Sequence, residues 1–342
     1  MWILFVLVVT AFAAKPTTIE EFLARPKTEP AQPLTGQALV DYVNEQQSFF
    51  QAEYNQQAEE LAKFRLMEPE FLVKPKKEEV LSDVYGDEPP ESFDARDHWK
   101  DCKSIGTIRD QSACGSCWAV SSAEAMSDQL CVQSNGRIKV LISDTDILSC
   151  CNTCGYGCRG GWMKRAYDWM ESTGVVTGGH FRQRGVCRPY AFYPCGHHED
   201  QKYYGPCPQG SWPTPRCRKT CQRGYNKSYA DDKYFATKSY YLPKDEKKIR
   251  QEIYKNGPVV AGFDVYTDFL HYKKGIYVHT SGYKSGAHAV KVIGWGRENG
   301  TDYWLIANSW NSDWGDNGYF RILRGKNHCG IEESMVGGLM KV

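Results

Sequence analysis

The cysteines are confined to one part of the chain, and this distribution constrains the fold more than any other feature. The chain has 342 residues and 14 cysteines, the first at Cys102 and the last at Cys329. A chain of this length can bury a sizeable core without crosslinks. Cysteines in this number therefore indicate folding in an oxidising compartment, where thiols pair. The sequence divides into a cysteine-free first part and a cysteine-rich body.

Charge divides the chain at nearly the same place. Residues 15–88, here called the leader, carry 8 Lys/Arg and 15 Asp/Glu, a net charge of −7. Residues 89–342, the body, carry 34 and 26, a net charge of +8. The whole chain has a formal net charge of only +1, which argues against a nucleic-acid or membrane-surface role. With 41% hydrophobic residues, the composition is that of an ordinary globular protein.

Residues 1–14 have the pattern of a signal peptide. An apolar run from Trp2 to Thr10 precedes the small residues Ala11, Ala13 and Ala14, as at a cleavage site. The run is too short to span a bilayer, and no later segment holds about 18 consecutive apolar residues. We therefore expect a protein of the secretory pathway, lysosomal or secreted, without a membrane span.

Hydrophobic periodicity predicts the elements of the leader. Residues 15–35 are rich in Pro, Thr and Glu and predict an irregular start. Residues 37–66 place apolar side chains at helical spacing and predict one amphipathic helix. Residues 68–90 contain four prolines and many charges, and they predict an extended linker. Glu88-Pro89-Pro90 is the expected boundary between leader and body.

The body combines helical and β patterns. Residues 117–131 predict a helix, whereas residues 150–225 show little periodicity and need crosslinks to hold them. From residue 234 onward, runs separated by Gly predict antiparallel strands, and Asn299-Gly300 predicts a hairpin turn. This order of elements is an α+β pattern. The expected strands include residues 289–295, 303–307 and 319–323.

The most informative string is Gln111 to Trp118, with the letters Q-S-A-C-G-S-C-W. Cys117 falls in the first turn of the predicted helix, where unpaired N–H groups favour the nucleophilic thiolate. The side chain of Gln111 and the N–H of Cys117 could together stabilise an oxyanion. By itself a C-x-x-C string in such a protein is more often structural, so a partner imidazole is needed.

A histidine and an asparagine stand on two successive predicted strands. His288 lies at the start of one strand, and Asn308 lies at the end of the next. Because neighbouring antiparallel strands bring such residues within reach, Asn308 could orient the ring of His288. Trp310 could then shield that hydrogen bond from water.

These motifs resemble the papain family, and among its members cathepsin B. The string C-G-S-C-W matches the family signature. His288 follows Cys117 by 171 residues and Asn308 by 191, and the extra length falls in the cysteine-rich middle, as in cathepsin B. The match covers nearly all of 89–342. It implies two lobes, a helical left lobe and a β-rich right lobe, with the active-site cleft between them and an N-terminal propeptide.

The resemblance also implies the roles of individual residues. Cys117 would be the nucleophile, His288 the acid and base, Asn308 the orienting residue and Gln111 the oxyanion donor. Gly160 and Gly161, which could be only a turn, would line the substrate cleft. The implied disulfides are Cys102–Cys131, Cys114–Cys158, Cys150–Cys217, Cys151–Cys154, Cys187–Cys221 and Cys195–Cys207, which leaves Cys329 outside the pairs. The alternative for Cys150, Cys151, Cys154 and Cys158 is a zinc site.

Residues 195–207 match the occluding loop of cathepsin B. In that family paired histidines on the loop, here His197 and His198, bind the C-terminal carboxylate of the substrate. The implied activity is that of a dipeptidyl carboxypeptidase as well as an endopeptidase. Asp110 and Asp313 match the acidic residues that tether the loop. The chain departs from the mammalian pattern at Gly196, at Arg159 and at Ser334, which takes the place of an acidic residue in the second substrate pocket.

The resemblance makes residues 15–88 an inhibitory propeptide and residues 89–342 the mature peptidase. The acidic leader complements the basic body, and we expect acid to trigger its removal near residue 88. Asn226 and Asn299 are glycosylation acceptors by motif, although Asn299 could be only a hairpin turn. The residues from Tyr303 to Gly315 resemble those of gut cathepsin B-like proteases of blood-feeding helminths, which implies blood proteins as substrates.

The expected partners are protein and peptide substrates, the propeptide and cystatin-type inhibitors, and we expect a monomer without metal or organic cofactor. One alternative is a transferase that uses the same thiolate to form an isopeptide bond. Another is a binding protein that has kept the scaffold, which an intact set of Cys117, His288 and Asn308 disfavours.

Overall fold

The computed structural model describes residues 15–26, 33–81 and 87–342. The expected signal peptide at residues 1–14 therefore lies outside the described residues. In the part of the chain that the structure describes, no helix has the length and apolar character needed to cross a membrane.

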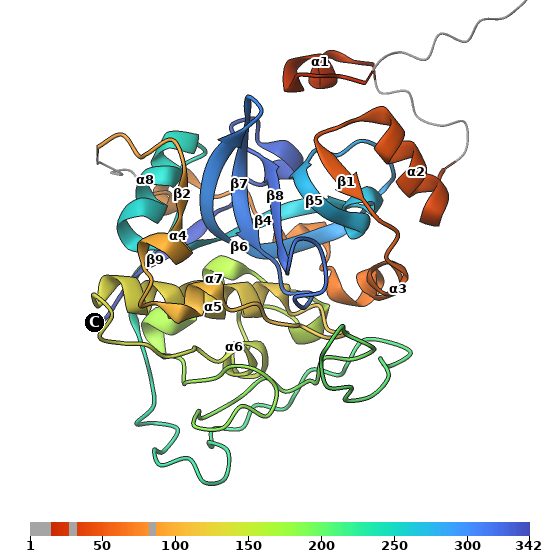
Figure 1. Ribbon diagram of the computed structural model, residues 1–342. Helices are drawn as coiled ribbons and strands as arrows, with labels where there is room; N and C mark the ends of the chain where they lie inside the picture. Colours follow the sequence, from red (N-terminus) through yellow and green to blue (C-terminus); the bar gives the residue numbers. More distant parts are fainter. Residues whose placement is uncertain (1–14, 27–32, 82–86) are drawn as a thin grey trace, which may run out of the picture.

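The body has the expected α+β arrangement of a helical lobe and a β-rich lobe (Figure 1). The helical lobe contains α5 (Cys117–Gln133), α6 (Asp144–Cys150) and α7 (Met163–Ser172), which lie on one side of the sheet. The β-rich lobe is built on β6 (Lys284–Glu298). The other strands and helices of the body are β2 (Phe93–Asp94), α4 (Ala95–His98), β3 (Ala236–Tyr241), α8 (Glu246–Asn256), β4 (Val259–Tyr266), β5 (Tyr272–Tyr277), β7 (Thr301–Ala307), β8 (Tyr319–Leu323) and β9 (Val336–Met340).

The strands form a sheet in the order β1-β5-β8-β7-β6-β4-β9-β3, in which β1 (Phe50–Ala52) comes from the leader, and β2 is paired to β6. As predicted, β6 and β7 form an antiparallel hairpin. Its turn is Asn299-Gly300, and both residues have positive φ, +51° and +77°, as a tight two-residue turn requires. One pairing, β5 with β8, is parallel and departs from the antiparallel prediction.

The predicted helix at residues 117–131 is confirmed as α5, and it is buried almost all round between the lobes. Because other parts of the protein enclose α5 on every side, its polar residues are buried along with its apolar ones. Asp128 makes a 2.8 Å ion pair with Lys291 of β6, so a charged contact joins the helix that begins at Cys117 to the strand that carries His288.

The single helix predicted at residues 37–66 is wrong. The segment forms α2 (Gly36–Gln46), the short strand β1 (Phe50–Ala52) and α3 (Gln56–Arg65). The side chain of Gln47 causes the break, because its Oε1 accepts hydrogen bonds from the N–H groups of Phe49 and Phe50. β1 then pairs with β5 and adds the leader to the sheet of the body.

Five further helices of the described residues were not predicted. α1 (Ile19–Ala24) lies in the segment expected to be irregular, α7 lies within residues 150–225, and α8 lies among the expected strands, while the short helices α4 and α6 lie on either side of α5. The spacing of the buried residues of α7 was readable in the sequence: Met163, Ala166, Tyr167 and Met170 form one helical face. The expected linker at residues 68–90 is mostly extended, with 3-10 turns at Pro69–Phe71 and Lys77–Glu79. The remaining 3-10 turns are Lys103–Gly106, Gly157–Arg159, Thr267–His271 and His328–Gly330.

Candidate active site

Cys117 is the first residue of α5 and is fully buried. Its thiol accepts hydrogen bonds from backbone N–H groups, including that of Ala289, the residue after His288 in β6. The thiol therefore lies where the helical lobe meets the β-rich lobe. Cys117 and Cys329 are the two cysteines outside the disulfides, and all 14 cysteines lie in the described part of the chain.

His288 and Asn308 are in direct contact, as the sequence predicted. Nε2 of His288 lies 2.7 Å from Oδ1 of Asn308, which also accepts the backbone N–H of Ser309 at 2.8 Å. Because an amide oxygen can only accept, the Nε2 of His288 carries the proton. The ring of Trp310 stacks on that of His288, with centroids 4.8 Å apart, and covers the pair.

Gln111 donates its side-chain N–H to the backbone oxygen of Arg65 in the leader, at 2.9 Å. The other end of the Gln111 amide is fixed, since its Oε1 accepts the hydroxyl of Ser309 at 2.8 Å. A leader carbonyl thus occupies the side-chain donor of Gln111, the residue expected from the sequence to stabilise an oxyanion.

Burial favours the neutral forms of Cys117 and His288. It raises the pKa of the Cys117 thiol to about 12, although backbone hydrogen bonds oppose the rise. Burial also lowers the pKa of His288 to about 4, although the hydrogen bond to Asn308 opposes the fall. Between pH 5 and 7 the two groups are therefore a thiol and a neutral imidazole in this form.

The leader runs along the boundary between the lobes. Met67 exchanges two backbone hydrogen bonds with Ala287, of 2.9 and 2.8 Å, next to His288. Phe71 lies against Gly160, where a Cβ would stand 2.3 Å from its ring. Gly160 has φ of +120°, so both its backbone conformation and its neighbours require glycine.

Leu72 fills the next position along the boundary. A Cβ on Gly262 would lie 2.4 Å from the Leu72 side chain and 3.3 Å from the Oγ of Ser334. Ser334 is buried, so the two residues beside Leu72 here, Gly262 and Ser334, are both small and neutral. Gly161 does not face the leader: a Cβ there would meet the ring of Trp118 at 2.6 Å, and its glycine is required by packing.

The segment 195–207 is closed by the Cys195–Cys207 disulfide and lies against α3. His198 bridges two carboxylates: its Nδ1 lies 2.9 Å from Asp313 and its Nε2 lies 3.3 Å from Asp110. His197 is exposed and stacks on Tyr203, with centroids 4.5 Å apart. The two histidines are therefore not equivalent, and His198 is the one that holds the loop.

Burial alone would lower the pKa of His198, but the hydrogen bond to Asp313 and the charges of Asp110 and Asp313 outweigh it and raise the pKa above 6.5. The ion pairs that hold the loop are consequently present in acid, and they are lost as the pH rises through this raised pKa. Arg65 of the leader also contacts Asp110, at 3.7 Å, and its positive charge opposes protonation of His198.

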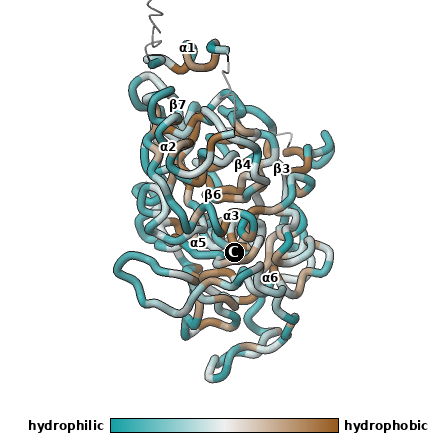
Figure 2. The backbone as a smooth tube through the Cα atoms, turned by 90° about the vertical axis from the view of Figure 1, so that its right-hand side faces the viewer, coloured by the Kyte–Doolittle hydropathy of each residue, from teal (hydrophilic) through white to brown (hydrophobic). Residues whose placement is uncertain are grey.

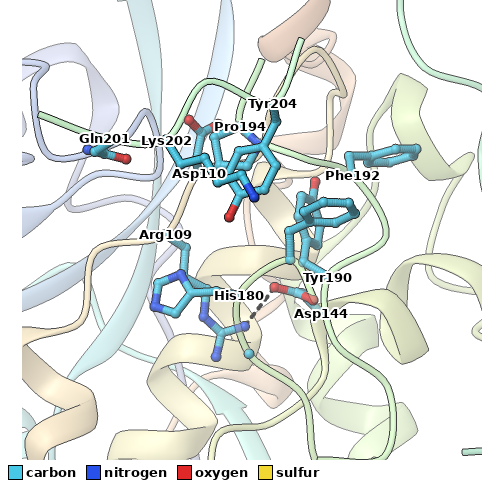
Figure 3. A pocket seen from close by; sticks show the side chains of 12 residues that line it. Arg109, Asp110, Asp144, His180, Tyr190, Phe192, Pro194, Gln201, Lys202 and Tyr204 are labelled. Carbon is cyan, nitrogen blue, oxygen red and sulfur yellow. Dashed lines mark hydrogen bonds and ion pairs between the residues drawn. The ribbon is translucent and has the colours of Figure 1, made fainter. Parts of the chain in front are cut away.

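A cavity of about 300 Å³ lies behind the loop (Figure 3). Its floor contains an ion pair between Arg109 and Asp144 of 2.7 Å, which Figure 3 marks. Tyr190 lines the same cavity and donates its hydroxyl to the backbone oxygen of Gln111, at 2.8 Å. The wall of the cavity is thus hydrogen-bonded to the backbone of Gln111.

Six disulfides join the pairs that the resemblance implied: Cys102–Cys131, Cys114–Cys158, Cys150–Cys217, Cys151–Cys154, Cys187–Cys221 and Cys195–Cys207. The four cysteines of the zinc alternative are all in disulfides, so they offer no thiolate to a metal. Among the described residues, no group of three or more His, Cys, Asp or Glu side chains is arranged to hold a metal ion.

Both glycosylation motifs are on the surface. Asn226 and Asn299 are exposed, and Asn299 occupies the β6–β7 turn.

Sequence reasoning did not find several residues of the site. Arg65 and Leu72 belong to the leader, and nothing in their spacing indicates that they reach the boundary between the lobes. Tyr190 lies 79 residues from Gln111, in the segment without periodicity. Ser309 follows Asn308 in the sequence, but its hydrogen bond to Gln111 joins residues far apart in the chain, and only the folded structure shows it.

Comparison with known proteins agrees with this geometry. Residues 89–339 match the family described as papain family cysteine protease. A cathepsin B-like cysteine proteinase 1 of Ostertagia ostertagi is 50% identical over 313 residues, which are 90% of this chain and 91% of the relative. A gut-specific cysteine proteinase of Caenorhabditis elegans is 47% identical over 317 residues, which are 90% of this chain and 92% of the relative.

A solved structure extends the likeness to the leader. The procathepsin B S9 of Trypanosoma congolense has a TM-score of 0.73 and 33% identity, and the alignment covers 91% of this chain and 99% of that one. The chain therefore belongs to the papain family of cysteine proteases and is a cathepsin B-like member of it.

Proposed function

We propose that Cys117, His288 and Asn308 form the catalytic site of this cysteine protease. The observation that carries the proposal is the hydrogen bond from His288 to Asn308. It occupies Nε2 of the ring and leaves Nδ1 buried without a hydrogen-bond partner among the described residues. With the thiol of Cys117 packed beside this strand, Nδ1 is the nitrogen available to take its proton.

Catalysis then follows from these positions once the leader has left. The Cys117 thiolate attacks the peptide carbonyl, and the oxyanion accepts hydrogen bonds from the Gln111 amide and the Cys117 N–H. The imidazolium of His288 gives its proton to the leaving amine, which departs and leaves a thioester. Water, deprotonated by His288, then hydrolyses the thioester and restores the thiol.

We further propose that residues 195–207 give the enzyme dipeptidyl carboxypeptidase activity beside endopeptidase activity. Docking of the loop by His198 closes one end of the cleft, and the exposed ring of His197 offers a hydrogen-bond donor to a terminal carboxylate.

His198→Ala is expected to lower dipeptide release at least about tenfold at pH 5 and to leave internal cleavage unchanged or raised, because the loop loses both of its ion pairs. In the native enzyme the ratio of dipeptide release to internal cleavage should fall from pH 5 to 7.5, as His198 loses its proton. The assay compares both activities across this range. A variant that releases dipeptides as well as the native enzyme would refute the role of the loop.

The leader, residues 15–88, is proposed as the inhibitor of this site, and residues 89–342 as the mature enzyme. The backbone contacts of Met67 and the Arg65 carbonyl at Gln111 support this assignment. Charge complementarity adds to it at the boundary, where Glu88 pairs with Lys247 and Arg250, at 2.5 and 3.3 Å. The Lys247 contact lowers the pKa of Glu88, so these exposed pairs are lost only as the pH falls through that lowered value.

At pH 4.5–5 the purified precursor is expected to convert itself to a form that begins near residue 88 and to become active, whereas at pH 7 it should stay intact. Gel analysis with N-terminal sequencing follows the conversion. Cys117→Ala should remain uncut at both pH values. Equal activity of the uncut precursor at neutral pH would contradict the proposal.

We also propose that the second substrate pocket accepts apolar or neutral side chains. In the precursor Leu72 lies beside Ser334, and Ser334 supplies no charge to pair with a basic residue of the substrate. Protein digestion, including that of blood proteins in a gut, is the proposed role, and the gut-specific relative supports it. Secretion or delivery to lysosomes, inhibition by cystatins and a monomeric state belong to the same proposal.

A further inference from the structure

The cavity behind the loop 195–207 combines a buried cation with several aromatic rings. Its volume is about 300 Å³, at the small end of the range of about 300–1,000 Å³ that ligand sites occupy. Arg109, which precedes α5, and Asp144, the first residue of α6, line it together with the segment between α7 and β3 (Figure 3). Figure 2 shows that the loops below α6 are mostly hydrophilic, so a cavity lined by rings is unusual at this end of the molecule.

Arg109 brings a hydrogen-bond donor without a partner to this cavity. The residue is buried, with 3% of its surface exposed. Its two Nη atoms donate to Asp144, at 2.7 Å, and to the backbone oxygen of Ile142, at 3.2 Å. Its Nε is buried and has no hydrogen-bond partner among the described residues. Because a buried donor left unpaired costs free energy, a ligand that places an acceptor in the cavity is stabilised there.

The charges around the cavity favour a negatively charged acceptor. The two carboxylates of the lining are already paired: Asp144 with Arg109, at 2.7 Å, and Asp110 with His198, at 3.3 Å. Lys202 adds an exposed positive charge to the same lining. An anion therefore meets carboxylates that are already paired, a cation at the surface and the Nε–H of a guanidinium, which forms a strong charge-assisted hydrogen bond with a carboxylate.

Aromatic side chains supply the apolar part of the cavity. Tyr190 and Phe192 pack edge to face, with ring centroids 5.6 Å apart. Phe181 and Tyr204 pack in the same way, with centroids 5.5 Å apart. Tyr204 belongs to the loop 195–207 and Phe181 does not, so the second pair joins the loop to the body. Rings held in such pairs offer rigid apolar surfaces against which another aromatic ring can pack.

We propose that this cavity binds a small aromatic carboxylate, whose ring packs among the four aromatic side chains and whose carboxylate accepts the Nε–H of Arg109. Cys117, His288 and Asn308 are not part of the lining. The inference therefore does not depend on the catalytic roles given above, and binding can be measured in a chain that hydrolyses nothing.

The test is calorimetric titration of 2-naphthoate into the full-length Cys117→Ala precursor at pH 7. A dissociation constant of about 1 mM or lower is expected for a ligand of this size. In the same background, Tyr204→Ala removes a ring of the cavity and should weaken binding at least about fivefold. The matched control is Tyr203→Ala, which removes the neighbouring ring that stacks on His197 instead, and it should bind like the parent.

Two further titrations test the hydrogen bond. Arg109→Lys keeps a positive charge beside Asp144 but removes the Nε–H, and it should weaken binding of 2-naphthoate at least about tenfold. 2-Naphthamide has the same ring system without the charge, and it should bind the parent at least about fivefold more weakly than 2-naphthoate. Thermal unfolding shows whether the Arg109→Lys chain is folded. If it is not, the tyrosine pair and the amide still decide the question.

Absence of binding of 2-naphthoate up to about 10 mM would overturn the proposal, and water would then be the partner of the Arg109 Nε. Equal affinity for the carboxylate and the amide would overturn it as well. A loss in Tyr203→Ala as large as that in Tyr204→Ala would place the ligand at His197, outside the cavity, with the same consequence.

Discussion

Replacing Cys117 with alanine is expected to abolish peptide hydrolysis, with a loss on the order of 10⁴-fold or more. The thiol is the only nucleophile that the protein supplies in the proposed mechanism, and Asn308 and Trp310 act on the substrate only through His288. Cys117 is fully buried at the start of α5, and alanine fits the same space, so the variant should fold. Hydrolysis of a fluorogenic peptide by the processed enzyme measures the effect.

His288→Ala is the companion variant, because a buried thiol without its imidazole stays protonated. Iodoacetamide at pH 5–6 should label Cys117 in the processed native enzyme, but neither in the processed His288→Ala enzyme nor in the intact precursor, where the leader buries the thiol. Mass spectrometry of the Cys117 peptide separates this label from any on Cys329. Activity that persists in Cys117→Ala would refute the catalytic assignment.

Glu124→Gln is expected to make the protein more stable at neutral pH, by up to about 3 kcal/mol. Glu124 is buried in α5, and neither of its carboxyl oxygens has a hydrogen-bond partner among the described residues. Burial raises its pKa from 4.5 to about 7, because the positive charges of Lys291 and Arg109 offset only part of the cost, and Asp128 and Asp144 add to it.

The sign of the effect follows from this raised pKa. The folded state keeps the proton where the unfolded chain has lost it, so the stabilisation is complete below about pH 4.5 and is lost as the pH rises through about 7. Urea unfolding of Cys117→Ala precursors at pH 5 and 7.5 measures it without self-digestion. The Glu124→Gln chain should match its parent at pH 5 and exceed it at pH 7.5. Glu91→Gln, at an exposed glutamate, should change neither value, and an equal fall for all three chains would contradict the assignment.

The leader shows where periodicity fails as a predictor. Phe50 and Tyr54 have helical spacing, yet Phe50 lies in a strand, because the Gln47 side chain captures two backbone N–H groups and β5 offers an open edge. The spacing of Phe50 and Tyr54 alone favours a helix. Pairing with β5 makes the strand the more stable conformation here. α7 is the opposite case. The helical spacing of its buried residues can be read in the sequence, but the aperiodic residues on both sides of it hid the pattern.

The class of chemistry could be predicted from the letters of the chain. A cysteine at a helix start, a histidine and an asparagine on successive strands, and the β6–β7 turn between them are local patterns, and local sterics and hydrogen bonding fix them. Three contacts became visible only in the folded chain: the Arg65 carbonyl at Gln111, Leu72 beside Ser334, and His198 rather than His197 between two aspartates. These contacts join residues far apart in the chain, and their energies depend on burial and on charges from other elements, which no local pattern encodes.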